Sequence, residues 1–314
     1  MKVLILGATG FIGFPAAQAL SRAGYFVYGQ TRSSEKAKRL AADEIFPVIC
    51  NPDSSSWHHL IPTLDVIIDT VGGDGHGPDA SKAVFQGIEA AAKNLRPSGS
   101  PKLSYIFTSG TWVHGDQGWD ILSDTTPVDS SGADSAPLVN WRPGVEQQVV
   151  KSQILNGIVV RPSLLYGRSG SIIGLMFDRV RKTGKVTWPA RRVSGSTDGK
   201  DGGRMATIHQ DDLADFYVRA AERAQVIGGL IFDVSNAYSD DTDGFLGRMC
   251  EVAGVKDGFE YYEPTNLFEK AITTQHIIRP YLARSLLGWE PKKPGLTDGL
   301  GLYWNAYLAH CVDV

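Results

Sequence analysis

Three regularly spaced glycines lie near the start of the chain, in the run Gly7-Ala8-Thr9-Gly10-Phe11-Ile12-Gly13. Because glycine has no Cβ, the first permits a tight turn, the second lets the backbone approach a pyrophosphate, and the third lets the following helix pack closely. The start of that helix offers unpaired N–H groups and the positive end of its dipole, which favour anions. The alternative is a glycine-rich turn that binds nothing. We expect a dinucleotide-binding loop that comprises Gly7, Thr9, Gly10, Phe11, Ile12 and Gly13.

A second group of candidate binding residues, Thr31, Arg32 and Ser33, follows the second predicted strand. NAD-specific sheets usually place a carboxylate here, on the ribose 2′-OH, but the first acidic residue in this stretch is Glu35. A guanidinium beside two hydroxyls suits a 2′-phosphate, and Lys36 adds a further cation. The alternative is solvated charges, although cations at a helix start oppose the helix dipole. The pattern therefore favours NADP(H) over NAD(H).

Alternating strands and helices must position these residues. We expect strands at 3–6, 25–29, 46–49, 66–69, 103–107 and 158–160, and helices at 13–22, 34–42, 81–95 and 143–154. The run Val3-Leu4-Ile5-Leu6 is apolar throughout, as in a strand buried on both faces. This alternation predicts an α/β fold with a Rossmann-type, doubly wound parallel sheet.

The second half of the chain has a weaker pattern. It predicts a strand at 230–234 and helices at 211–224, 243–253, 264–275 and 280–287, with a polar surface loop or lid at 190–203. We therefore expect an NADP-binding Rossmann domain at 1–165, completed by the strand near 230–234, and a smaller, mostly helical substrate lobe at 166–314. Since no Pro/Gly/Ser linker separates them, the two parts should pack together.

Five segments in order resemble the extended and atypical short-chain dehydrogenases/reductases, the NAD(P)-dependent epimerase/dehydratase-like group. They are the glycine loop and the segments 107–115, 160–167, 208–214 and 287–291. The resemblance implies a catalytic Ser or Thr in the second segment. It also implies that Pro162 and Ser163 lie beside the nicotinamide, and that homodimers are possible.

One departure from that family concerns its Tyr-x-x-x-Lys pair, in which the tyrosine moves a proton while the cofactor moves a hydride. The matching region, 138–146, contains neither residue. Asn140 or Trp141 stands in place of the tyrosine, and Gly144 or Val145 in place of the lysine. The fold and the cofactor site therefore carry over from the family, but the usual proton relay does not.

Other side chains could assist a reduction. Ser109 and Thr111 follow the end of a predicted strand, where open α/β sheets place ligands, although their hydroxyls could instead satisfy the turn. His114 could donate a proton near neutral pH, but a packed or exposed histidine is the more common case. Arg142 could polarise a substrate oxygen or pair with Asp116 or Asp120.

For several further residues we expect a structural role rather than a catalytic one. Glu146 fits a helix N-terminal charge that stabilises the dipole, and the family role of Tyr166 is packing. Four tryptophans could line a flat apolar substrate, with core packing as the alternative. They are Trp112, Trp119, Trp141 and Trp188.

Composition narrows the functional classes. A net charge of -3 does not indicate the basic surface that binding to nucleic acid or to an anionic membrane requires. The three cysteines are far apart and show no metal-ligand spacing, so we expect no metal. Without a signal peptide or a long apolar segment, the simplest location is the cytoplasm.

The leading hypothesis is an NADP(H)-dependent oxidoreductase that reduces a small organic carbonyl, enone or imine with a nonstandard proton donor. A catalytically degenerate, NADP-binding regulatory or redox-sensing protein would also lack the Tyr-x-x-x-Lys pair. A third possibility is a non-redox isomerase or epimerase-like enzyme that keeps the cofactor.

Overall fold

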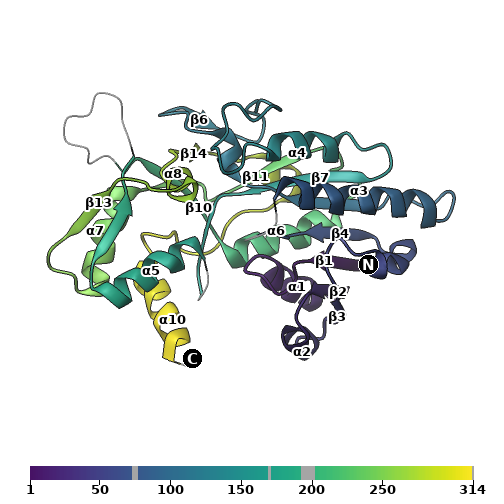
Figure 1. Ribbon diagram of the computed structural model, residues 1–314, viewed down its shortest axis with the longest axis horizontal. Helices are drawn as coiled ribbons and strands as arrows, with labels where there is room; N and C mark the ends of the chain where they lie inside the picture. The colour runs from purple at the N-terminus through teal and green to yellow at the C-terminus, as the bar shows by residue number, and fades with distance from the viewer. Residues whose placement is uncertain (73–76, 169–170, 192–201, 313–314) are drawn as a thin grey trace.

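A parallel sheet forms the centre of the first lobe (Figure 1). The computed structural model describes residues 1–72, 77–168, 171–191 and 202–312. Within these residues the sheet has seven strands in the order β11-β7-β5-β4-β1-β2-β3, all paired in parallel. The strands are β1 (Lys2–Leu6), β2 (Phe26–Thr31), β3 (Phe46–Ile49), β4 (Val66–Asp69), β5 (Ser104–Thr108), β7 (Asn156–Pro162) and β11 (Ile231–Val234). The predicted Rossmann-type sheet is confirmed.

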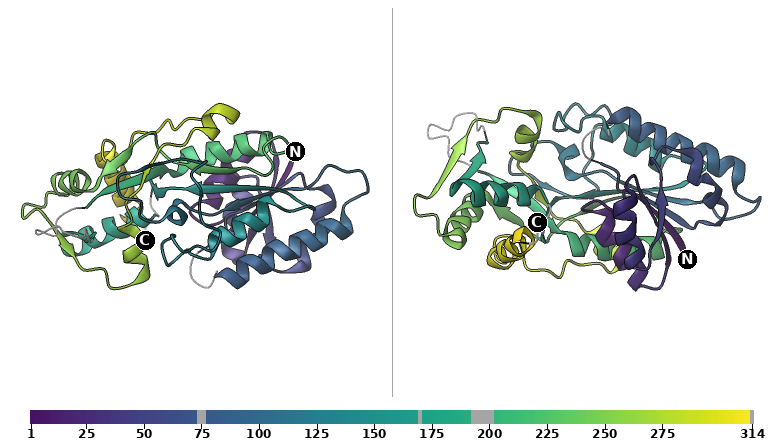
Figure 2. Two further views of the ribbon diagram at one scale, coloured as in Figure 1. Left: turned by 90° about the horizontal axis from the view of Figure 1, so that it is seen from above. Right: turned by 60° about the horizontal axis from the view of Figure 1, so that its bottom comes forward.

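Both faces of this sheet are buried, which explains the continuous apolar run of β1. Val3 and Ile5 join the core on one face, and Leu4 and Leu6 join the core on the other, as the alternation of side chains along a strand requires. One face is covered by α1 (Gly13–Arg22), α2 (Ser34–Ala42), α6 (Gln210–Glu222) and α9 (Leu282–Leu287). The other is covered by α3 (Pro78–Leu95), α4 (Arg142–Val150) and the 3₁₀ segment η1 (Ser55–Thr63). The views of Figure 2 show these helices on opposite sides of the strands.

The second lobe lies at the other end of the long axis, on the left of Figure 1. Its helices are α5 (Ile172–Thr183), α7 (Thr242–Ala253), α8 (Leu267–Ile272) and α10 (Leu300–Val312). Three small sheets, β12-β10-β8, β13-β9 and β14-β6, accompany them in the described residues. Their strands are β6 (Ile121–Leu122), β8 (Leu164–Tyr166), β9 (Val186–Pro189), β10 (Arg204–His209), β12 (Ser239–Asp241), β13 (Phe259–Tyr262) and β14 (Ile277–Ile278). The lobe is thus a mixture of helix and sheet, where the sequence predicted mainly helix.

Two predicted helices of the second half are shorter in the structure. The prediction at 264–275 corresponds to α8, which starts only after Asn266, whose side-chain oxygen accepts a hydrogen bond from the Glu269 N–H over 2.9 Å. The prediction at 280–287 corresponds to α9, which begins after Pro280. Of the predicted lid at 190–203, residues 192–201 lie outside the described residues. None of the helices described has the length and apolar character needed to cross a bilayer.

Candidate functional site

The glycine loop joins β1 to α1 through a turn that requires glycine at two positions. Gly7 has a φ of +76°, in the left-handed region, and its N–H donates to the side-chain oxygen of Gln30 over 2.9 Å. A Cβ added to Gly13 would lie 2.3 Å from the carbonyl oxygen of Gly7 and 2.6 Å from Thr70 Oγ1. The first turn of α1 therefore packs directly on the end of β1.

We expect Gly13→Ala to lower the free energy of unfolding by about 1–3 kcal/mol, because the new methyl group overlaps backbone that must then shift. The matched control is Gly247→Ala in α7, where an added Cβ meets no described atom within 4 Å. That change should raise stability by up to about 1 kcal/mol, because alanine favours a helix interior. Urea unfolding followed by circular dichroism measures both. Equal stabilities of the two variants would contradict the close contact at Gly13.

A cavity of about 240 Å³ opens beside the glycine loop. It lies at the carboxyl ends of β1, β2 and β4, where the order of the strands reverses, which is the usual ligand position in such sheets. Five of the predicted cofactor residues line it: Gly7, Thr9, Gly10, Thr31 and Arg32. The other lining residues are Gln30, Lys36, Pro52, Thr70, Val71 and Gly72. We call it the phosphate cavity, because its glycine cradle and its basic residues fit an anionic ligand.

Two cations give the phosphate cavity its charge. Arg32 and Lys36 are exposed, and neither forms an ion pair within the described part of the chain. Thr31 Oγ1 lies 3.1 Å from Thr9 Oγ1, so the hydroxyls of these two predicted cofactor residues form a hydrogen bond with each other. Ser33 does not line the cavity; its hydroxyl accepts a hydrogen bond from the Lys36 N–H over 3.2 Å and caps α2. The capping role explains Ser33 without a ligand.

The remaining predicted cofactor residues lie elsewhere. Ile12, Pro162 and Ser163 line a second cavity, described next. Gly13 provides the close packing of α1, and Phe11 lines none of the cavities described. The predicted set is thus divided between two neighbouring cavities, with Gly10 on one and Ile12 on the other.

The second cavity, of about 730 Å³, lies between the two lobes at the carboxyl ends of β5 and β7. We call it the substrate cavity. Most of its surface is apolar, from Ile12, Pro78, Trp112, Leu138, Val139, Trp141, Pro162, Leu164, Leu165, Ile172 and Phe268. Its polar side chains are Ser109, Thr111, Arg142 and Ser163, and Arg142 is the only ionisable one among the described residues that line it. Such a lining is typical of a site for a small organic molecule.

Three polar atoms of the substrate cavity are buried without a hydrogen-bond partner in the described residues. They are Ser109 Oγ, Ser163 Oγ and Arg142 Nε. Each buried polar group left in this state costs about 1–3 kcal/mol, so most are paired in folded proteins. All three residues line this one cavity, where the polar groups of a bound ligand can complete them. Ser109 and Arg142 therefore remain candidates, and Thr111 remains one because it lines the same cavity.

His114 does not line the substrate cavity. It is buried in the 3₁₀ segment η2 (Thr111–His114), and its Nε2 lies 2.9 Å from a carboxylate oxygen of Asp233. We therefore explain His114 as a packed histidine that pairs with a strand of the main sheet, and we no longer retain it as a proton donor.

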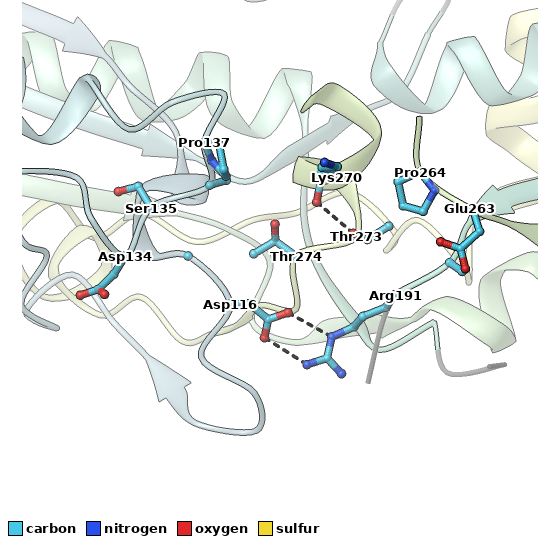
Figure 3. Close-up of a pocket in the computed structure, with 13 residues that line it drawn as sticks. Asp116, Asp134, Ser135, Pro137, Arg191, Glu263, Pro264, Lys270, Thr273 and Thr274 are labelled. Atoms are coloured by element: carbon cyan, nitrogen blue, oxygen red, sulfur yellow. Dashed lines mark hydrogen bonds and ion pairs between the residues drawn. The ribbon is translucent and has the colours of Figure 1, made fainter. Parts of the chain in front are cut away.

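Asp116 was one alternative partner for Arg142, and Figure 3 shows where it lies. It lines a third cavity, of about 570 Å³, which shares no lining residue with the other two. Its carboxylate accepts two hydrogen bonds, of 3.0 and 3.1 Å, from Arg191. Burial raises the pKa of Asp116, but Arg191 and the backbone N–H groups of Gly118 and Gln275 together lower it by more, so the net shift is downward. Asp116 is therefore engaged by Arg191, and among the described residues no ion pair joins Asp120 to Arg142 either.

Glu146 differs from its predicted role as a dipole-stabilising charge. It is fully buried, and both its carboxylate oxygens accept hydrogen bonds from Arg161, at 2.5 and 3.1 Å. Arg161 also lies 3.9 Å from Asp233. The role predicted from position in the helix was wrong, because the fold brings β7 and its arginine against α4.

Burial lowers the pKa of the Arg142 guanidinium, against the opposing attraction of the Glu146 and Asp69 carboxylates. A guanidinium starts from so high a pKa that it stays protonated at neutral pH. Arg142 therefore supplies a fixed positive charge at the substrate cavity and is unsuited to be the proton donor.

The aromatic residues divide between the cavity and the core. Trp112 and Trp141 line the substrate cavity, Trp119 is exposed, and Trp188 is buried against Phe245. Tyr166 is packed, as expected: its hydroxyl donates to the carbonyl oxygen of Pro294 over 2.9 Å.

Sequence reasoning missed several residues of both cavities. Gln30 holds the Gly7 N–H, and Thr70 Oγ1 donates to the carbonyl oxygen of Leu6 over 2.7 Å. Both stand at strand ends beside the glycine loop, and that position was a usable signal. Phe268 and Ile172 come from distant helices of the second lobe, so no local pattern indicated them.

Comparison with known proteins agrees with this geometry. Residues 3–93 match the model of the NAD dependent epimerase/dehydratase family. A protein of Aspergillus terreus named "NAD-dependent epimerase/dehydratase terH" is 31% identical over 157 residues, which is 45% of this chain and 44% of that protein. The chain thus matches less than half the length of this relative. A Streptomyces protein, "3-diazoavenalumate denitrifying reductase", is 24% identical over 96% of this chain and 99% of its own length.

Solved structures share the fold across the whole chain. The dTDP-glucose 4,6-dehydratase of Bacillus anthracis, in complex with NAD, has a TM-score of 0.79 at 16% identity, covering 98% of this chain and 97% of that one. The UDP-glucose-4-epimerase of Stenotrophomonas maltophila, with bound NAD, has a TM-score of 0.77 at 16% identity, with both chains fully covered. At this identity the likeness concerns the fold alone.

Proposed function

We propose that this chain, which belongs to the NAD dependent epimerase/dehydratase family, is an NADP(H)-dependent reductase of a small organic carbonyl, enone or imine. The observation that carries the proposal is that the phosphate cavity and the substrate cavity lie next to each other. Within the described residues, the phosphate cavity holds two cations without an ion pair, and the neighbouring substrate cavity holds buried polar atoms without a hydrogen-bond partner. A nicotinamide dinucleotide would supply the hydride. The name of the Streptomyces relative, a reductase, agrees with this reaction class.

The residues of the phosphate cavity fit the cofactor. Gly7, Gly10 and the start of α1 would hold the pyrophosphate through backbone N–H groups. Arg32 and Lys36 would hold the 2′-phosphate, which favours NADP(H). Pro162 and Ser163 line the next cavity, where the family resemblance places the nicotinamide.

The residues of the substrate cavity would stabilise the negative charge that develops on the substrate during the reaction. When a hydride reaches a carbonyl or imine carbon, negative charge develops on the neighbouring oxygen or nitrogen. The hydroxyl of Thr111, together with the positive charge of Arg142 acting through space, can stabilise that charge in an apolar surrounding. Since no described lining residue is a tyrosine, lysine, histidine or carboxylic acid, we assign the proton to solvent.

The test is turnover by the purified protein with NADPH. Aldehydes, ketones, enones and imines are offered in turn, and loss of the reduced-nicotinamide absorbance is followed. NADPH deuterated at C4 then shows whether the label enters the product. Substrate-dependent oxidation with label transfer supports the proposal. If the protein has no measurable affinity for NADPH or NADH, the proposed reductase function is wrong.

One observation favours a second candidate, an NADP-binding protein without turnover. Neither the sequence nor the described lining of the substrate cavity contains the Tyr-x-x-x-Lys pair at the matching position. Tight NADPH binding with no oxidation by any substrate of the panel would select this regulatory function.

A further inference from the structure

Among the described residues that line the substrate cavity, Arg142 is the one fixed charge, and no described residue forms an ion pair with it. Arg142 forms no ion pair and no side-chain hydrogen bond in the part of the chain that is described. Arg161, the other buried arginine of this region, is bound by both oxygens of Glu146. An unpaired cation in an apolar cavity is costly unless an anion joins it.

Two carboxylates act on Arg142 through space, but each is held by other groups. Glu146, one turn along α4, accepts three hydrogen bonds from Arg161. Asp69 accepts from the Tyr105 hydroxyl over 2.6 Å and from the Val71 N–H over 3.0 Å. The positive charge of Arg142 therefore remains available to a ligand.

Two buried hydroxyls belong to the same part of the cavity as Arg142. A Cβ built on Gly110 would lie 3.6 Å from Arg142 Nη1 and 3.8 Å from the carbonyl oxygen of Pro162. The guanidinium thus lies against Gly110, the residue between Ser109 and Thr111, and Ser163 lines the same cavity. Ser109 and Ser163 are 5% and 2% exposed, and their hydroxyls have no partner among the described residues. A guanidinium with two such hydroxyls is a donor set for a carboxylate.

The rest of the cavity excludes many anions. Its walls are aromatic and aliphatic, with Trp112 and Phe268 in edge-to-face contact at 6.2 Å and Trp141 at 5.3 Å from the guanidinium carbon. One cation and few polar groups cannot match a diphosphate or a polyhydroxylated sugar, because their remaining polar groups would be desolvated without partners. A flat, conjugated body that carries one carboxylate fits the cavity's walls and charge.

We propose that the substrate of this chain is a conjugated or aromatic monocarboxylate, whose carboxylate binds Arg142 with the hydroxyls of Ser109 and Ser163. The inference rests on the proposed function and names the substrate class of the same cavity.

The experiment compares two probes that differ only in charge, trans-cinnamate and trans-cinnamamide. Their Kd values are measured by calorimetry on the protein saturated with NADP⁺, after binding of NADP⁺ alone has been established. Wild type should bind cinnamate at least about tenfold more tightly than the amide, as expected for a charge-assisted hydrogen-bonded pair. Arg142→Met should remove this preference and leave the affinity for the amide within about twofold.

A matched control distinguishes the loss of the Arg142 charge from the loss of an arginine elsewhere. Arg179 also lies near an aromatic ring, 5.2 Å from Tyr262, but outside the substrate cavity. Arg179→Met should keep the wild-type preference. Ser109→Ala, a milder change, should reduce the preference about threefold or more, which tests the site if Arg142→Met fails to bind NADP⁺.

Equal affinity of wild type for the two probes overturns the proposal, as does a preference that survives Arg142→Met, or no binding of either probe at millimolar concentration. The proposed function fails separately, when NADP⁺ does not bind or NADPH is not oxidised. If the protein prefers the carboxylate probe but oxidises no NADPH, the carboxylate-binding site is supported and the reductase function is rejected.

Discussion

Replacing Arg32 with aspartate is expected to raise the Kd for NADPH about 100-fold and to change the Kd for NADH by no more than a few fold. Arg32 lines the phosphate cavity and is free of ion pairs in the described structure, so its charge is available to the 2′-phosphate. The substitution removes a charge-assisted hydrogen bond and adds a repulsive carboxylate. That carboxylate also suits the ribose 2′-OH of NADH, as in NAD-specific sheets.

Lys38→Asp is the control for this prediction. Lys38 is exposed on α2, the helix that follows Arg32, but it does not line the phosphate cavity, so the change in net charge is identical while the contact is absent. Both dinucleotides are titrated by fluorescence or calorimetry at one ionic strength, because salt screens exposed charges. If Arg32→Asp weakens NADPH and NADH equally, Arg32 makes no contact with the 2′-phosphate.

The sequence predicted the first lobe well because its signals are local. Buried parallel strands appear as apolar runs such as Val3 to Leu6, and some helices have a recognisable start, as with Ser33 before α2 and Pro78 at the start of α3. The glycine loop is also a local signal, since one turn contains all three glycines. The loop, five residues of the phosphate cavity and the sheet could therefore be placed without coordinates.

The second lobe was harder to predict for two physical reasons. Its strands are short and pair across long stretches of chain, as when Leu164 of β8 pairs with Thr207 of β10. Helix α10 is apolar on most sides, so it lacks the stripe that identifies an amphipathic helix. Helix α5 did carry a usable signal, with Ser171 as its N-cap and Gly184 in the left-handed conformation at its end.

The roles of charged residues depended on tertiary contacts. Glu146 stands in the first half of α4, and position alone suggested a dipole interaction. Only the packing of α4 on β7 shows that Arg161 binds it, and that Arg142 is left without a partner in the described residues. Pairing between distant segments is what a single sequence does not display.

Removing Glu146 should have a large effect on stability. We expect Glu146→Ala to lower the free energy of unfolding by about 3–5 kcal/mol, because it leaves the buried guanidinium of Arg161 with Asp233 as its nearest anion, at 3.9 Å. Glu146→Gln keeps the volume and one hydrogen-bond acceptor, so its loss should be smaller. Urea unfolding of each variant, followed by circular dichroism and by tryptophan fluorescence, measures the difference.

The exposed pair between Arg168 and Asp211 provides the comparison. Its geometry is also bidentate, with hydrogen bonds of 3.0 and 3.1 Å, but the Arg168 side chain is 59% exposed. Since water solvates either charge once its partner is gone, Arg168→Ala should cost at most about 1 kcal/mol. A Glu146→Ala variant no less stable than Arg168→Ala would mean that water or rearrangement compensates Arg161. The explanation of why Glu146 does not neutralise Arg142 would then fail as well, because it requires a tight pair between Glu146 and Arg161.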